Sequence, residues 1–253
     1  MKHKPPFYEI GDRRYPSVTT VLSVIAKPAL VQWAANEASK AALDFAMEVW
    51  DRKTPITEAE FKSWKKAHRD KADKALDIGT WLHDLMDFLL GVRAAHPGPC
   101  PDLATGENLE RAAKGAVEGL GLRLVENGRK VWRDGIGEQY AGTFDAIVEK
   151  GGLRYLVDWK TSSAVFGEMH LQTAAYVKAR LHVFWEDRKD EGGAMAVVVP
   201  GRAIVRLDKK TGGYEWVESP LSLEEDYAAF IACLKLYNWQ TRDAAWRKEG
   251  VKK

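Results

Sequence analysis

Two aspartates and a lysine occupy one short stretch in which their spacing could create a reactive site. Asp145 precedes a β-rich run, the dipeptide Gly151-Gly152 follows that run, and a second β-rich run ends in Asp158 and Lys160. Two glycines between such runs predict a two-residue hairpin turn of type I′ or II′. Counting outward from the turn sets Asp145 directly across from Asp158, with Cβ atoms ~4.5–5.5 Å apart, and side-chain alternation puts Lys160 on the same face.

Two opposed carboxylates need compensating positive charge. Like charges that face each other across two strands destabilise the pair, and Lys160 supplies a single positive charge. A divalent cation supplies two, and carboxylate oxygens are ligands that suit Mg²⁺ or Mn²⁺. The hairpin therefore predicts a metal site. The alternative is a longer loop, in which the two aspartates diverge or face solvent.

The chain that surrounds the hairpin is predicted to alternate between strands and helices. Strands are expected near 122–132 and over Tyr140–Lys150 and Leu153–Lys160, then a helix over about Gly167–Trp185, a β-rich stretch over Ala194–Leu207 and its return over 214–217. Ser222 and Glu225 form a capping box for a last helix. Gln172 and Tyr176 are four residues apart, so they share one face of the helix that follows Lys160.

The first half of the chain is predicted to be mainly helical. A hairpin or extended arm is expected over 7–15, followed by a helix that begins at Ser17 or Thr19 and another that runs from Pro28 to about Trp50. The Thr57–Glu60 capping box starts a long helix to about Leu90, and a break near Ile78-Gly79 is one alternative. A further helix is expected over Gly106–Gly119. We therefore expect one domain over residues 1–253, with a helical half over about 16–120 and a sheet with helices over about 121–253.

Composition and charge limit the class of protein. The 253 residues are 45% hydrophobic and 29% charged, as in ordinary globular chains. No apolar run is long enough to cross a membrane, and no signal-peptide core follows the basic N-terminus, so we expect a cytoplasmic protein. The net charge of +2 does not indicate nucleic acid by itself. The basic run Lys62–Lys74 is either a solvated helix face or a phosphate contact.

Cysteine usage excludes several kinds of site. The chain contains two cysteines, Cys100 and Cys233, and they are far apart. This count excludes a disulfide framework, a four-cysteine zinc site and an iron–sulfur cluster.

Four short motifs follow one another along the chain. They are Gly79-Thr80-Trp81-Leu82-His83, Gly142-Thr143-Phe144-Asp145, Asp158-Trp159-Lys160-Thr161-Ser162, and Gln172 with Tyr176. Together they resemble the G-T-x-x-H, G-x-x-D, D-x-K and Q-x-x-x-Y motifs of the RecB-type exonuclease branch of the PD-(D/E)xK nuclease superfamily. The resemblance extends over roughly Tyr15 to Tyr237. It implies an α/β (α+β) fold with a restriction-endonuclease-like core, in which helices flank a central mixed β-sheet.

The resemblance also implies roles for the residues of these motifs. Asp145, Asp158 and His83 are expected to bind Mg²⁺, which Mn²⁺ can replace, with the backbone carbonyl of Trp159 as a further ligand. Such a metal lowers the pKa of a bound water and clamps phosphate oxygens. Lys160 is expected to orient the attacking water and to stabilise developing negative charge, and its alternative role is a salt bridge to Asp145.

The remaining candidates have weaker signals. Gln172 and Tyr176 are expected near the scissile phosphate or the DNA end, with a core role as the alternative for Tyr176. Asp87, one helical turn after His83, is a candidate to orient its imidazole. Glu126 matches an acidic position that the branch often has upstream of the hairpin. Two more candidates, Thr161 and Ser162, are expected either to bond a DNA phosphate or to cap the turn after the strand.

The expected activity is divalent-metal-dependent hydrolysis of DNA. The resemblance favours an exonuclease that acts on DNA ends in recombination, repair or phage replication, in a bacterial host cell and encoded by a phage or prophage. The alternatives are an endonuclease of the same fold and a catalytically silent nucleic-acid-binding module. The expected partners are DNA and a recombination or single-strand-binding protein.

Overall fold

The computed structural model describes residues 5–49, 55–186 and 199–250. The chain divides into two compact units, one formed by Met1–Ile25 with Thr80–Lys253 and the other by Ala26–Gly79. Whether the two act as the single domain predicted from the sequence stays a prediction.

The larger unit is built on a five-stranded mixed sheet. Its strand order is β3-β6-β7-β8-β9, in which β7 and β8 are parallel and the other neighbours are antiparallel. The strands are β3 (Arg123–Asn127), β6 (Ala146–Lys150), β7 (Leu153–Lys160), β8 (Gly201–Leu207) and β9 (Tyr214–Glu218). A central mixed sheet flanked by helices is the architecture expected from the sequence, and that expectation is confirmed.

The turn between β6 and β7 has the predicted geometry. Gly151 and Gly152 have φ angles of 58° and 81°, so both occupy the left-handed region that a type I′ turn requires and that glycine tolerates. Lys150 pairs with Leu153 as expected, and the antiparallel ladder continues as far as Ala146 and Val157. The register predicted from the sequence is therefore confirmed over the whole of β6.

The prediction of one continuous strand over Tyr140–Lys150 is wrong. The segment forms β5 (Glu138–Thr143) and β6, with Phe144 and Asp145 between them. β5 pairs with β4 (Lys130–Gly135) in a separate two-stranded sheet. A break is needed here because the chain changes partner strands and buries Phe144 completely. Gly128 lies against this break: a Cβ atom there would be 2.4 Å from the carbonyl oxygens of Phe144 and Asp145.

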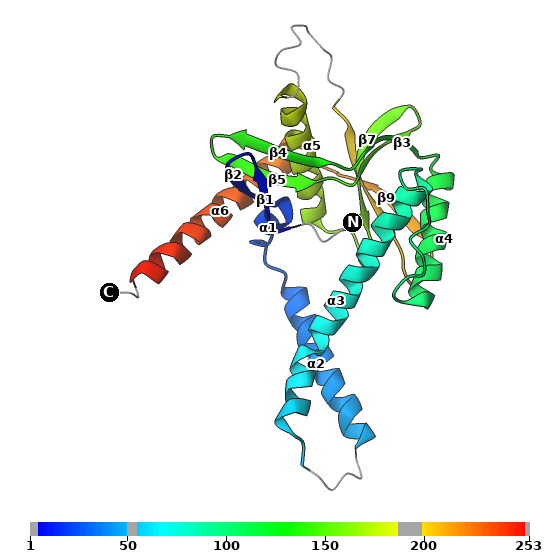
Figure 1. Cartoon of the computed structure of the whole chain (residues 1–253), viewed down its shortest axis with the longest axis vertical. Helices are drawn as coiled ribbons and strands as arrows, with labels where there is room; N and C mark the ends of the chain where they lie inside the picture. The colour runs from blue at the N-terminus through cyan, green and yellow to red at the C-terminus, as the bar shows by residue number, and fades with distance from the viewer. Residues whose placement is uncertain (1–4, 50–54, 187–198, 251–253) are drawn as a thin grey trace. The chain divides into compact units, whose positions relative to one another are not determined.

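Helices cover both faces of the five-stranded sheet (Figure 1). α5 (Gly167–Glu186) connects β7 to β8, since parallel neighbours need a crossover. α4 (Leu103–Gly119) packs on β8 and β9. α6 (Leu223–Gly250) and the short α1 (Val18–Leu22) both pack on α5. The N-terminal hairpin, β1 (Phe7–Ile10) and β2 (Arg13–Pro16), lies against β5.

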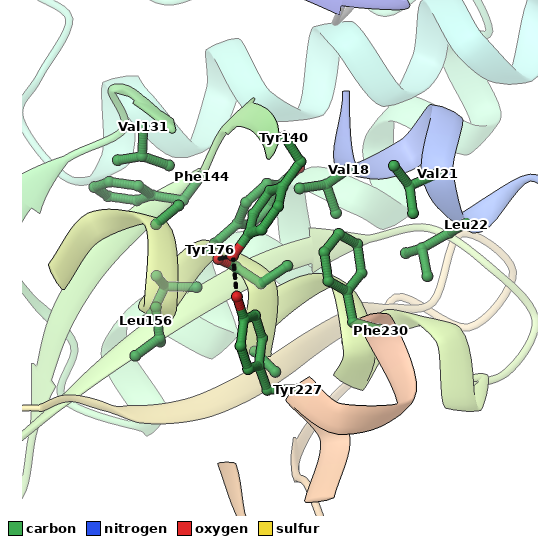
Figure 2. Packing of buried hydrophobic residues seen from close by; sticks show 14 of the residues in the cluster. Val18, Val21, Leu22, Val131, Tyr140, Phe144, Leu156, Tyr176, Tyr227 and Phe230 are labelled. Atoms are coloured by element: carbon green, nitrogen blue, oxygen red, sulfur yellow. Dashed lines mark hydrogen bonds between the residues drawn. The ribbon is translucent and has the colours of Figure 1, made fainter. Parts of the chain in front are cut away.

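The hydrophobic core of this unit fills the space between α1, α5, α6, β5 and the sheet (Figure 2). Tyr140 and Phe230 meet edge to face, with ring centroids 4.7 Å apart. The Tyr140 hydroxyl donates to the carbonyl of Ala175 at 3.1 Å and lies 3.4 Å from the hydroxyl of Tyr227. Burial raises the pKa of Tyr227 to about 12. Each large apolar side chain buried here contributes roughly 1.5–3 kcal/mol to folding.

Most predicted helix starts are confirmed. The Ser17 side chain accepts a hydrogen bond from the backbone N–H of Thr20 at 3.0 Å and caps α1. The Ser222 hydroxyl likewise accepts from the backbone N–H of Glu225 at 3.2 Å, while the Glu225 carboxylate accepts from the Ser222 N–H at 3.0 Å. The prediction that a helix begins at Gly106 is wrong by three residues, because Asp102 accepts from the Thr105 N–H at 3.0 Å and starts α4 at Leu103.

The smaller unit contains α2 (Pro28–Glu48) and most of α3 (Glu58–Leu89). The predicted capping box starts α3: the Thr57 backbone N–H donates to the Glu60 carboxylate at 2.8 Å. α3 passes through Ile78-Gly79 as one helix, so the alternative with a break there is wrong. The rings of Phe45 and Trp64 are 5.3 Å apart.

The smaller unit buries little of its surface. Among the side chains that the structure describes between 26 and 79, Ile78 alone is buried. In the basic run, Lys62 pairs with Glu58 and Lys71 pairs with Glu37. The choice between a solvated face and a phosphate contact stays a prediction.

Two further sequence predictions concern the start of the β-rich segment near residue 194 and the absence of a membrane-spanning helix. The stretch 194–198, predicted as the start of a β-rich segment, lies outside the described residues, and β8 begins at Gly201. Among the described helices, none combines the length and the apolarity that a membrane span requires.

Candidate active site

Asp145 lies at the break between β5 and β6, one residue before the antiparallel ladder begins. Its side chain is almost completely buried, and its Oδ2 accepts a hydrogen bond from the backbone N–H of Trp159 at 3.0 Å. This bond ties Asp145 to β7 directly beside Asp158. The predicted position directly across the hairpin from Asp158 lies beyond the ladder, which ends at Ala146 and Val157, so it is the bond to Trp159 that holds Asp145 there.

Asp158 is the most deeply buried charged group of the site, with 0% exposure. An ionised carboxylate in such a place needs a charged or hydrogen-bonded partner. Lys160 supplies the positive charge through an ion pair with Oδ2, and Gln172 donates from Nε2 to Oδ1 at 3.3 Å. The same-face position predicted for Lys160 is confirmed. The alternative role considered for Lys160 was a salt bridge to Asp145, and that pairing stays a prediction beside the ion pair with Asp158.

His83 reaches the site from the C-terminal part of α3, which belongs to the same compact unit as the sheet. Its Nδ1 lies 3.5 Å from Oδ2 of Asp145, and its side chain is 19% exposed. Asp87 lies one turn further along α3. Burial raises the pKa of Asp87, and a positive charge on His83 lowers it. His83 is thus placed beside Asp145 as expected, while orientation of its imidazole by Asp87 stays a prediction.

Gln172 and Tyr176 form a hydrogen-bonded chain that ends on Asp158. Gln172 Nε2 lies within hydrogen-bond distance of both Asp158 Oδ1 and the Tyr176 hydroxyl, at 3.3 and 3.1 Å. The Tyr176 ring is buried in the hydrophobic core. The Tyr176 ring therefore has the core position considered as an alternative in the sequence analysis. The Tyr176 hydroxyl contacts Gln172.

The glycine of the predicted G-x-x-D motif has a structural explanation. The Tyr176 ring lies against Gly142, where a Cβ atom would be 2.4 Å from Tyr176 Cε1. Any side chain at 142 would push the ring, whose hydroxyl is bonded to Gln172. Gly142 is thus required by the packing that positions Gln172 beside Asp158.

Glu126 is engaged by two arginines. Arg180, on α5, donates to Oε2 of Glu126 from Nε at 2.9 Å and from Nη2 at 2.6 Å. Arg129 Nε lies 3.2 Å from Oε1. Glu126 pairs across β3 and β6 with Ile147, two residues after Asp145. Glu126 is therefore near the hairpin, as a carboxylate held by two guanidinium groups.

Arg180 was missed in the sequence analysis, although a signal for it exists. It follows Gln172 by eight residues and Tyr176 by four, so the three share one face of α5. Arg129 has no comparable signal, because it lies in the turn between β3 and β4.

Thr161 and Ser162 follow β7, in the connection that leads to α5. The Ser162 hydroxyl donates to the carbonyl of Ala164 at 2.7 Å, which agrees with the turn-capping alternative for Ser162. Thr161 is half-buried, and its predicted contact with a DNA phosphate stays a prediction.

The donor atoms suit a hard divalent cation in kind. Asp145 and Asp158 supply carboxylate oxygens, which suit Mg²⁺ and Mn²⁺. His83 supplies an imidazole nitrogen, which is a softer ligand than the oxygens that these two ions prefer. Two carboxylates are thus buried here beside one lysine. Within the part of the chain that the structure describes, however, no three His, Cys, Asp or Glu side chains converge closely enough to form a ready metal cage. The two carboxylates therefore suit such a metal in kind, and the ligand arrangement stays a prediction.

No protein-family model matches the chain, and a search of curated proteins also finds no match.

Proposed function

We propose that this chain is a divalent-metal-dependent nuclease that hydrolyses the phosphodiester bonds of DNA. Its active site is formed by Asp145, Asp158 and Lys160. The observation that carries the proposal is the burial of two neighbouring carboxylates beside one lysine at the break before β6. Carboxylates buried inside a protein need a compensating partner, because uncompensated charge there is costly. Two buried carboxylates beside a single lysine give a reason for a cation, and the four sequence motifs give a reason for DNA.

Each residue of the site has a distinct role in this proposal. A bound Mg²⁺ would lower the pKa of a water and neutralise charge on the phosphate. Asp145 and Asp158 would hold the ion, with His83 as a further ligand. Lys160 would orient the water and stabilise the negative charge that develops on the phosphate oxygens.

Gln172 and Tyr176 act through Asp158. The Gln172 amide donates to one oxygen of Asp158 and leaves the other to Lys160. Because Gln172 is also bonded to Tyr176, whose ring is buried, the orientation of the Asp158 carboxylate is coupled to core packing. Both residues are therefore positioning residues in this proposal.

The proposed reaction is exonucleolytic, in recombination, repair or phage replication, because the motifs resemble those of RecB-type exonucleases. A linear plasmid and its covalently closed circular form separate this reaction from endonuclease activity. In Mg²⁺, an exonuclease degrades the linear form alone, whereas nicking of the closed circle indicates an endonuclease.

Substitutions at the site test its assignment. Lys160→Ala should lower the cleavage rate roughly 10²–10³-fold, the cost of removing one donor to a developing oxyanion, and Asp158→Ala should remove the activity. Glu118→Gln and Lys235→Ala change exposed charges elsewhere in the same unit and should leave the rate unchanged. Wild-type rates in both site variants would disprove the assignment.

A further inference from the structure

An open groove of about 520 Å³ lies beside β1, on the N-terminal hairpin. We call it the β1 groove. Its lining combines aromatic and charged side chains from β1, β2 and β4: Phe7, Tyr8, Glu9, Arg14 and Lys130, next to the two prolines that precede β1. The proposed nuclease chemistry uses none of these residues.

Each aromatic ring of the β1 groove is paired with a cation. The Arg14 guanidinium carbon lies 4.0 Å from the centre of the Phe7 ring, and Lys130 Nζ lies 5.9 Å from the centre of the Tyr8 ring. Glu9, which pairs with Arg14 across the hairpin, offsets one of the two positive charges. The groove thus has a net charge of +1. Phe7 is half-buried and Tyr8 is buried, so Phe7 is the ring with surface left for a ligand.

The β1 groove is joined to the chain segment of the candidate active site through Thr143, the last residue of β5. The Tyr8 hydroxyl lies 3.1 Å from Oγ1 of Thr143, and Lys130 pairs with Thr143 across β4 and β5. Thr143 precedes Asp145 by two residues, which corresponds to at most ~7 Å of extended chain. The strand that underlies the groove therefore leads directly to the segment that carries Asp145.

We propose that the β1 groove binds a single-stranded segment of DNA next to the bond that is cleaved. Single-stranded nucleic acid is recognised by aromatic rings on which bases stack, within a cationic groove that follows the backbone. Phe7 supplies the ring, and Arg14 and Lys130 supply the positive charge. A base inside a duplex is already stacked on both faces, so it cannot use Phe7 in this way. The identity of the ligand rests on the proposed function, because the groove leads to the same site.

This inference is tested by measuring how tightly the full chain binds a labelled oligothymidylate of about 12 nucleotides. Binding is measured by fluorescence anisotropy in EDTA, so that no metal-dependent cleavage takes place. Phe7→Ala should raise the Kd roughly 5- to 100-fold, the cost of losing one base stack, and Phe7→Tyr should restore tight binding. Lys130→Gln should reduce the slope of log K against log salt by about 0.7, the contribution of one phosphate contact on a single strand. Circular dichroism verifies that each variant is folded.

Matched controls come from α6. Trp239→Ala removes a ring that is 62% exposed, and Lys235→Gln removes an exposed lysine. Both should leave the Kd and the salt slope unchanged. A duplex of the same length should bind equally well to wild type and to Phe7→Ala.

The outcomes separate this inference from the proposed nuclease activity. Normal single-strand binding by Phe7→Ala and Lys130→Gln would overturn the inference, even if the wild type cleaves DNA. An equal loss of duplex binding would also overturn it, because the groove would then be a general phosphate contact. If the wild type binds the single strand but lacks nuclease activity, and the two variants lose that binding, the groove is supported and the proposed chemistry is disproved.

Discussion

Gly142 lies under the ring of Tyr176, and substitution to alanine there tests the packing that positions the site. The new Cβ atom would be 2.4 Å from Tyr176 Cε1, whereas carbon atoms in ordinary contact are ~3.5–4.0 Å apart. The ring or the β5 backbone must therefore move by about 1 Å. Tyr176 is buried in the core, so the displacement has no open space to enter.

The expected cost follows from this overlap. Forcing an extra methyl group into a packed core costs about 1–3 kcal/mol. For a chain of this size each kcal/mol lowers the Tm by about 2–4 °C, so Gly142→Ala should lower the Tm by roughly 2–12 °C. The moved hydroxyl also disturbs Gln172 and, through it, Asp158. A misplacement of about 1 Å at a reactive group costs up to ~10²-fold in rate.

A double-mutant cycle identifies the clash as the cause. Unfolding free energies are measured by urea titration for Gly142→Ala alone and in Tyr176→Leu and Tyr176→Phe backgrounds. Leucine removes the ring edge, so the cost of Gly142→Ala should fall in that background, and phenylalanine keeps the edge, so the cost should persist. Gly167→Ala is the matched control, since a Cβ there meets nothing within 4 Å. Equal costs in all backgrounds would refute the reasoning.

Three further predictions concern stability. Asp226→Ala should lower the free energy of unfolding in urea by about 3–5 kcal/mol, because it leaves Arg202 buried without the carboxylate that its guanidinium contacts at 2.7 Å. A decrease of less than about 1 kcal/mol would contradict this account. The pKa of Tyr227 is raised by burial from 10.0 to about 12. Its contribution to stability is therefore complete below pH 10 and is lost as the pH rises through about 12. Tyrosinate absorbance of the folded chain should show a late step, and Tyr227→Phe should reduce its amplitude by one tyrosine. Ser222→Ala removes the cap of α6 and should cost about 1 kcal/mol of stability, measured by thermal unfolding. The control Ser39→Ala, at an exposed position inside α2, should change stability by less than about 0.5 kcal/mol. Equal effects of the two substitutions would argue against the cap.

The hairpin register was predictable because it depends on local information. The Gly151-Gly152 turn and side-chain alternation suffice to place Lys160 on the face of Asp158, and the ladder follows that register. The capping boxes at Thr57 and Ser222 were predictable for the same reason, since each joins residues three apart.

The parts that sequence reasoning missed depend on tertiary contacts. The break at Phe144 arises because β5 and β6 pair with different sheets, which local β-propensity does not encode. The ion pair between Lys160 and Asp158 is a different case, because the two residues are two apart on the same strand and the contact is local. The arginines that hold Glu126 come from α5 and from the turn before β4, and nothing in the local sequence around Glu126 indicates them.

The most direct test of the proposed function is digestion of end-labelled single- and double-stranded DNA by the full chain and by its Asp158→Asn variant, in Mg²⁺ and in EDTA. This substitution keeps the shape of the side chain and removes the charge that pairs with Lys160. The proposal predicts progressive shortening of labelled DNA by wild type in Mg²⁺, none in EDTA and none with the variant. Intact DNA with wild type in both Mg²⁺ and Mn²⁺, or equal digestion by the variant, would contradict it.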